Sequence, residues 1–204
     1  MTSDFTTPAS EERIQRTVEA LRANNIETLV VDDADAAKRA TLERIPDGAE
    51  VHSGASKTLQ DTGIQAALEA SPRITWLRKQ LLTMDRATQG REMRRLAAAP
   101  DVMLGSVSAV TESGTLVTAS NSGSQLGPYA STAGTLILVI GAQKIVKDLD
   151  EAMRRIYEHA LPLESVRLRA IFGVDSYVSK ILITNRDPRP GRTTAILVRE
   201  ALGF

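Results

Sequence analysis

The sequence of 204 residues contains no cysteine. This absence excludes disulfide bonds, thiolate nucleophiles, cysteine-ligated iron–sulfur clusters and zinc sites built on thiolates. Histidine is nearly as scarce, because only His52 and His159 occur and they lie far apart in the sequence. We therefore expect neither a metal site nor a bound cofactor.

Aromatic residues are few, and neither sign of charge is in excess. The chain has three Phe, three Tyr and one Trp, and its 25 Lys and Arg residues balance its 25 Asp and Glu residues. Surfaces that bind nucleic acid usually combine clustered basic side chains with aromatic stacking platforms. Because the arginines and lysines are spread along this chain, we predict that nucleic acid is not a partner.

Long apolar runs are missing as well. The longest, such as residues 136–140, are far shorter than the roughly 20 residues of a membrane-spanning helix. Residues 1–8 contain no basic region followed by an apolar stretch, so they do not have the pattern of a signal peptide. These features predict a cytoplasmic protein without a membrane span, with residues 1–9 as a disordered lead and residues 10–204 as a single domain.

Helix and strand patterns alternate from the start of the predicted domain. Ser10 can cap a helix in which Ile14, Val18 and Leu21 share one face. Residues 26–31 then form an apolar run rich in β-branched residues, which is typical of a strand. This alternation is the first indication of an α/β fold.

The same alternation continues toward the end of the chain. Residues 134–140 are almost continuously apolar, as in a strand buried within a covered sheet. A helix is expected to begin at Asp148 and to end near Pro162, and two further strands, at residues 180–184 and 194–198, are separated by a hairpin-like loop. We predict a single α/β domain with a mostly parallel sheet covered on both faces and ligand sites at the carboxyl ends of its strands.

One acidic residue, Glu112, stands where the strand-like sequence of residues 109–117 is interrupted before Gly114. Two polar segments that contain glycine, at residues 52–58 and 121–125, each lie beside an apolar run. We expect both segments to converge on the Glu112 carboxylate. Glu112 is therefore the candidate catalytic residue.

The polar segments contain the groups that an anionic ligand would need. Residues 53–58 predict a strand, a loop of small residues and a helix start, an arrangement in which free backbone N–H groups converge on an anion. Lys144 directly follows a predicted strand, where its charge could balance Glu112 or an anionic substrate. The predicted ligand-binding residues are Ser53, Gly54, Ser56, Lys57, Thr58, Gly114, Asn121, Ser124, Gln125 and Lys144.

Each of these residues also has a purely structural interpretation. Glu112 can accept local backbone hydrogen bonds that fix its corner, and the serines of residues 53–58 can cap the following helix. Residues 121–125 can form a turn stabilised by Asn and Ser side chains. Lys144 can be an exposed cation before a helix, and His52 a hydrogen-bonded histidine at a strand end rather than a general base.

Five short motifs occur together in a specific order. They are Ser-Gly-Ala-Ser-Lys-Thr-Leu at residues 53–59, Gly-Ser-Val-Ser-Ala-Val-Thr-Glu-Ser-Gly-Thr-Leu at 105–116, Gly-Ser-Gln-Leu at 123–126, Val-Ile-Gly-Ala-Gln-Lys-Ile-Val at 139–146 and Asp-Leu-Asp-Glu-Ala at 148–152. This combination resembles the LUD domain family, which includes lactate-utilisation protein C. The likeness extends from about residue 10 to Phe204.

The resemblance implies a fold of the type shared by ribose-5-phosphate isomerase, glucosamine-6-phosphate deaminase and CoA transferases. It also implies a role in bacterial oxidation of L-lactate to pyruvate beside iron–sulfur partner subunits. Some relatives carry a cysteine cluster in their C-terminal part, whereas residues 172–180 of this chain contain no cysteine. This chain therefore has no thiolates for such a cluster.

Two functional hypotheses follow. The first is a protein of lactate utilisation or related organic-acid metabolism, an enzyme or an accessory subunit, that binds a small anionic metabolite and works with iron–sulfur oxidoreductase subunits. The second is a stand-alone CoA transferase or sugar-phosphate isomerase-like enzyme, because residues 111–114 look like the motif in which CoA transferases place a nucleophilic glutamate, here Glu112. A homo-oligomer is compatible with both hypotheses.

Overall fold

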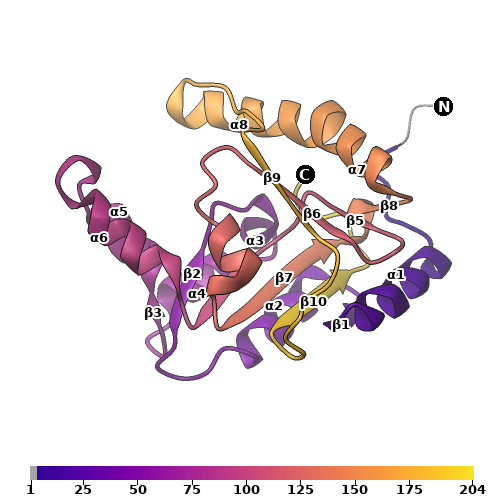
Figure 1. The fold of residues 1–204 in the computed structure, drawn as a ribbon, viewed down its shortest axis with the longest axis horizontal. Coiled ribbons are helices and arrows are strands. Elements are labelled where there is room, and N and C mark those ends of the chain that lie inside the picture. The colour runs from indigo at the N-terminus through magenta and orange to yellow at the C-terminus, as the bar shows by residue number, and fades with distance from the viewer. Residues whose placement is uncertain (1–3) are drawn as a thin grey trace.

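The computed structural model describes residues 4–204, and its centre is a parallel β-sheet (Figure 1). The strands occur in the order β1-β10-β7-β4-β2-β3, and every neighbouring pair is parallel. Their bounds are β1 (Ile26–Val31), β2 (Glu50–Ser53), β3 (Thr75–Trp76), β4 (Val102–Gly105), β7 (Thr135–Gly141) and β10 (Thr193–Val198). The predicted α/β domain with a mostly parallel sheet is thus confirmed.

Side chains of β7 alternate between the two faces of this sheet, as strand geometry requires. Leu138 packs in the same apolar cluster as Val18 on one face, and Val139 packs in the same cluster as Leu68 on the other. Both faces are therefore covered, which explains why β7 is apolar almost without interruption.

Eight α-helices of the described chain surround the sheet or extend from it. Figure 1 shows α5 and α6 extending away from the side of the sheet near β2 and β3, while α7 and α8 lie together beyond β9. The bounds are α1 (Glu11–Ala23), α2 (Ala34–Glu43), α3 (Lys57–Asp61), α4 (Ile64–Ala70), α5 (Leu77–Thr83), α6 (Arg86–Ala98), α7 (Leu149–Arg155) and α8 (Leu161–Phe172). None of the helices in residues 4–204 is both long and apolar enough to cross a membrane.

A second sheet of four short strands lies beside the first. Its order is β8-β5-β6-β9, with β5–β6 and β6–β9 antiparallel and β5–β8 parallel. The strands are β5 (Ala109–Thr111), β6 (Leu116–Ser120), β8 (Ile145–Val146) and β9 (Lys180–Thr184). The predicted hairpin-like connection before β10 is wrong, because β9 belongs to this second sheet. The fully buried β10 instead pairs on both sides within the central sheet.

The helix expected to end near Pro162 also continues further. A π-helical turn, η3 (Ile156–Ala160), joins α7 to α8, which runs on to Phe172. Pro162 is the second residue of α8, and the backbone stays helical through Ala160 and Leu161, with the Leu161 N–H donating to the Ile156 carbonyl. Proline therefore does not stop the helix here.

Residues 4–9 pack against the domain, unlike the disordered lead expected over residues 1–9. Phe5 is buried in a cluster with Ala109 and Val117, and the Ala9 N–H donates to the Ala142 carbonyl at 3.2 Å. Residues 1–3 of the expected lead lie outside the described residues. The packed domain thus includes residues before the first helix.

A buried ion pair secures the loop between β9 and β10. Arg192 Nη1 donates to Asp187 Oδ2 at 2.9 Å, and both side chains are 4% exposed. The same guanidinium donates to the carbonyls of Pro128 (2.6 Å), Tyr129 (3.2 Å) and Ala133 (3.2 Å). It thereby holds a second π-helical turn, η1 (Pro128–Thr132), against the central sheet.

Replacing Asp187 with alanine should destabilise the protein strongly, because Arg192 would stay buried without its counter-charge. We expect Asp187→Ala to lower the free energy of unfolding by about 3–5 kcal/mol, measured by urea unfolding. The control is Asp47→Ala, which breaks an ion pair with Arg73 whose side chains are 75% and 57% exposed. This second loss should be below about 1 kcal/mol, and equal losses would contradict the role given to Asp187.

Candidate functional site

A cavity of about 270 Å³ lies at the carboxyl ends of β2 and β4, bordered by β6 of the second sheet. Of the predicted ligand-binding residues it is lined by Gly54, Ser56, Lys57, Thr58, Asn121, Ser124, Gln125 and Lys144. The two polar segments therefore do converge, although not on Glu112. Ligand pockets of α/β proteins commonly lie at this edge of the sheet.

Lys144 lies in η2 (Ala142–Lys144), the short turn that directly follows β7. Its side chain is 3% exposed, and Nζ lies 2.9 Å from Thr58 Oγ1, 3.0 Å from Ser106 Oγ and 3.3 Å from the Val107 carbonyl oxygen. All three partners are uncharged. Burial, reinforced by the charge of Arg155, holds the pKa of Lys144 well below its ordinary value.

Asp61 is the carboxylate whose charge opposes this lowering of the Lys144 pKa. Its oxygens are engaged elsewhere, because Oδ1 pairs with Lys57 and Oδ2 accepts a hydrogen bond from the Gly203 N–H at 3.1 Å. No carboxylate of residues 4–204 forms an ion pair with Lys144. The amine therefore reaches the cavity without an ion-pair partner among the described residues.

A second cation, Arg155, is completely buried behind the cavity. Its guanidinium donates to the carbonyls of Ser108 and Gln143, while Nη2 has no hydrogen-bond partner in the described chain. Burial lowers the pKa of Arg155 to about 10, which still leaves it charged at neutral pH. A buried guanidinium without an ion-pair partner among the described residues therefore lies beside Lys144.

The segment of residues 54–58 contributes hydroxyl groups rather than an extended helix terminus. The helix α3 has five residues, and Ser56 caps it by accepting a hydrogen bond from the Leu59 N–H at 3.3 Å. The structural interpretation of Ser56 thus holds, while the same residue lines the cavity. A Cβ atom at Gly54 would lie 3.7 Å from Gln125 Cβ, so the two polar segments meet at this point.

The loop of residues 121–125 is held by its own hydrogen bonds. Ser120 Oγ donates to Gln125 Oε1 at 3.0 Å and accepts from the Gly123 N–H at 2.9 Å. Ser122 Oγ donates to Ser124 Oγ at 3.1 Å. The turn stabilised by polar side chains is therefore present, and it forms one wall of the cavity.

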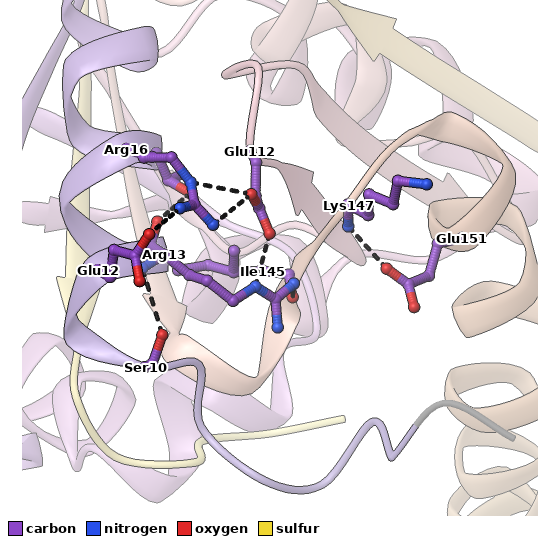
Figure 2. A network of polar contacts seen from close by, with 9 residues as sticks. Ser10, Glu12, Arg13, Arg16, Glu112, Ile145, Lys147 and Glu151 are labelled. Carbon is purple, nitrogen blue, oxygen red and sulfur yellow. Dashed lines mark hydrogen bonds and ion pairs between the residues drawn. The ribbon is translucent and has the colours of Figure 1, made fainter. Parts of the chain in front are cut away.

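Glu112 lies outside the residues that line the cavity. Figure 2 shows Arg13 and Arg16 of α1 reaching the Glu112 carboxylate, with Nε–Oε1 at 2.6 Å and Nη2–Oε2 at 2.9 Å. Although burial opposes it, hydrogen bonding to these arginines lowers the pKa of Glu112 below its ordinary value. The expectation that Glu112 forms the centre of the pocket is not met, because α1 binds this carboxylate instead.

Two other predicted residues also lie away from the cavity lining. Gly114 has a φ of +79°, and a Cβ atom there would lie 2.7 Å from the backbone of Ala20. Glycine is therefore required for close packing against α1. Ser53 accepts a hydrogen bond from Trp76 Nε1 at 3.3 Å, which gives it a structural role at the end of β2.

His52 is buried in β2 and does not line the cavity. Burial, with a contribution from the charge of Arg78, lowers the pKa of His52 to about 4. Its Nδ1 has no hydrogen-bond partner in the described chain. The structure therefore shows a neutral interior histidine, without the hydrogen bond that the structural interpretation supposed.

Sequence reasoning missed Ser106 and Tyr129, which both line the cavity. The Tyr129 hydroxyl accepts from the Ser106 N–H at 3.1 Å and donates to the Ser106 carbonyl at 3.2 Å. A Cβ atom at Gly105 would collide with this hydroxyl, so glycine at the end of β4 admits the tyrosine. The Gly105-Ser106 pair after an apolar strand was the available signal, because Ser53-Gly54 places the same two residue types, in the reverse order, at the end of another strand.

The model of the LUD domain matches residues 14–198. The chain belongs to the LUD domain family. The family resemblance drawn from the sequence motifs is thereby confirmed.

A solved structure supports the fold of this LUD-domain protein. The present chain is similar to the crystal structure of a DUF162 family protein from Deinococcus radiodurans, with a TM-score of 0.57 and 12% sequence identity. The similarity covers 94% of this chain and 99% of that chain. At this identity the likeness shows a shared fold alone. No curated protein matches the chain.

Because burial lowers the pKa of Lys144, this residue should make stability depend on pH in a specific direction. Below the ordinary lysine pKa the unfolded chain binds a proton that the folded protein does not bind, so stability should rise as pH rises through this range. The free energy of unfolding of the wild type, relative to that of Lys144→Met, should rise by up to about 1.4 kcal/mol per pH unit as pH approaches roughly 10.4.

The measurement is urea unfolding of both proteins at pH 7, 8, 9 and 10. Lys57→Met is the matched control, because Lys57 is part-exposed and paired with Asp61. The difference in free energy of unfolding between the wild type and this control should not rise toward alkaline pH. A flat difference for Lys144→Met would contradict the lowered pKa of Lys144.

Proposed function

We propose that this LUD-domain protein binds a small organic acid in the cavity and acts in organic-acid metabolism such as the oxidation of L-lactate to pyruvate. The observation that carries the proposal is the buried amine of Lys144, which faces the cavity without a carboxylate partner in the described chain. An anionic ligand would supply the missing negative charge.

Electrostatics favours an anion at this position. Taking a charged group out of water is costly unless an opposite charge or hydrogen bonds compensate it. Arg155 is such a group, and burial together with Coulomb repulsion from Arg155 disfavours the charged form of Lys144. A bound carboxylate would favour the ammonium form of Lys144 and would raise its pKa.

The other groups of the cavity suit a small, oxygen-rich metabolite. Hydroxyls of Ser56, Ser106 and Ser124 and the amides of Asn121 and Gln125 can hydrogen-bond to a hydroxy or keto oxygen. The volume of about 270 Å³ lies at the small end of ligand pockets, which favours a compact acid. Such an acid matches the metabolite class expected from the family resemblance.

Oxidation of a hydroxy acid also requires an electron acceptor. We infer that iron–sulfur oxidoreductase subunits provide it, with the present chain as a substrate-binding subunit. Support for this part comes from the resemblance to lactate-utilisation protein C. CoA-transferase or isomerase chemistry through Glu112 finds no support in the geometry, because Arg13 and Arg16 bind that carboxylate outside the cavity lining.

Within a panel of L-lactate, pyruvate, sugar phosphates and CoA esters, the proposal predicts thermal stabilisation by L-lactate or pyruvate and not by the other two classes. A ligand at 100 times its dissociation constant should stabilise the folded protein by about 2.7 kcal/mol. Lys144→Met should abolish this shift. Because the ligand raises the pKa of Lys144, binding takes up a proton, and affinity should fall as pH rises between the free and bound pKa values.

Glu112→Gln is the matched control, since it changes a carboxylate outside the cavity lining. It should lower the baseline melting temperature through the loss of its arginine pairs and leave the ligand-induced shift intact. If Lys144→Met retains the full shift, or if neither L-lactate nor pyruvate stabilises the wild type, the proposal is wrong.

A further inference from the structure

We propose that Lys144 Nζ adds to the carbonyl carbon of a 2-oxo acid bound in the cavity and forms an imine with it. This inference rests on the proposed function and narrows its ligand class from organic acids in general to those with a carbonyl carbon beside the carboxylate. It also assigns a covalent reaction, imine formation, to a residue of the cavity.

The first support is the position of the amine. Lys144 lines the cavity, and no carboxylate of the described residues holds its Nζ as an ion pair. An amine is nucleophilic only when it is deprotonated, and burial without a counter-charge favours the neutral form. The lowered pKa of Lys144 has this same physical cause.

The hydrogen bonds around Nζ suit a neutral amine. Thr58 Oγ1 can donate to the Leu202 carbonyl at 3.3 Å and accept one N–H of Lys144. The Val107 carbonyl accepts the second N–H. Ser106 Oγ, at 3.0 Å, can turn its proton toward the nitrogen lone pair or away from it. A rotation of this hydroxyl therefore frees the lone pair for attack.

The reaction balances without an oxidant or a reductant. The Nζ lone pair forms a C–N bond while the carbonyl π electrons move to oxygen, and one amine proton passes to that oxygen to give a carbinolamine. The second amine proton then moves to the same hydroxyl as the C–O bond breaks, water leaves and the C=N bond forms. Ser106 Oγ lies close enough to Nζ to relay these protons.

The choice of a 2-oxo acid follows from charge. The neutral imine becomes a cation when it takes up one proton from water, and the ligand carboxylate on the adjacent carbon would pair with that cation inside the same low-dielectric cavity. The carboxylate would therefore favour the protonated imine, which is the form that cyanoborohydride reduces. A 2-hydroxy acid carries the same carboxylate but no electrophilic carbon, so it should bind without reacting.

The test is reductive trapping on the chain of 204 residues. The protein is incubated at pH 7 with pyruvate and sodium cyanoborohydride, and peptides are mapped by mass spectrometry. We expect a single reduced adduct at Lys144, formed faster than adducts at the other lysines. L-lactate should stabilise the protein thermally, give no adduct and slow the labelling by pyruvate.

Lys147→Met is the matched control, because the Lys147 side chain is 80% exposed and lies three residues from Lys144. This variant should be labelled at Lys144 like the wild type, whereas Lys144→Arg should lose the adduct. At saturating pyruvate, Ser106→Ala should slow the labelling of Lys144 by about tenfold or more. This variant tests the proton relay even if a change at Lys144 prevents folding.

The outcomes separate this inference from the proposed function. Thermal stabilisation by pyruvate or lactate without an adduct at Lys144 would overturn the imine and leave organic-acid binding intact. Labelling of Lys144 no faster than that of exposed lysines would also overturn it. If neither acid stabilises the protein and no adduct forms, both this inference and the binding of these acids fail.

Discussion

The burial of the Lys144 amine among uncharged partners is the constraint on which the site depends. The central strand β7 carries the chain through the core, and the turn η2 immediately places Lys144 where the two sheets meet. Arg155 adds a buried charge beside it. Such an arrangement costs stability, and costs of this kind are characteristic of functional sites rather than of cores.

Much of the central sheet could be predicted from the sequence, because its strands are short apolar runs with clear ends. Residues 134–140 and 194–198 are examples, since both correspond to strands buried on both faces. The second sheet could not be predicted in the same way. Its strands have only two to five residues. They also pair with strands that lie far away in the sequence, as β6 does with β9, and local periodicity does not encode such pairings.

The sequence predicted the two loops that line the candidate site, but the residue that it placed at the centre, Glu112, does not line the cavity. Residues 54–58 and 121–125 carry small and polar side chains after strands, and this local signal placed them on the cavity. The role of Glu112 depends on Arg13 and Arg16, which lie 99 and 96 residues away in the sequence. Nothing within residues 109–117 distinguishes a carboxylate bound by a helix from one that faces a ligand.

Packing far from the amine fixes the hydroxyls that surround it. The Asp187–Arg192 pair holds the Tyr129 carbonyl, and the Tyr129 hydroxyl in turn binds both backbone polar groups of Ser106. Ser106 Oγ then lies 3.0 Å from Lys144 Nζ. A buried ion pair and a tyrosine therefore determine the position of this hydroxyl. No charged side chain in the cavity is needed to hold it beside Lys144.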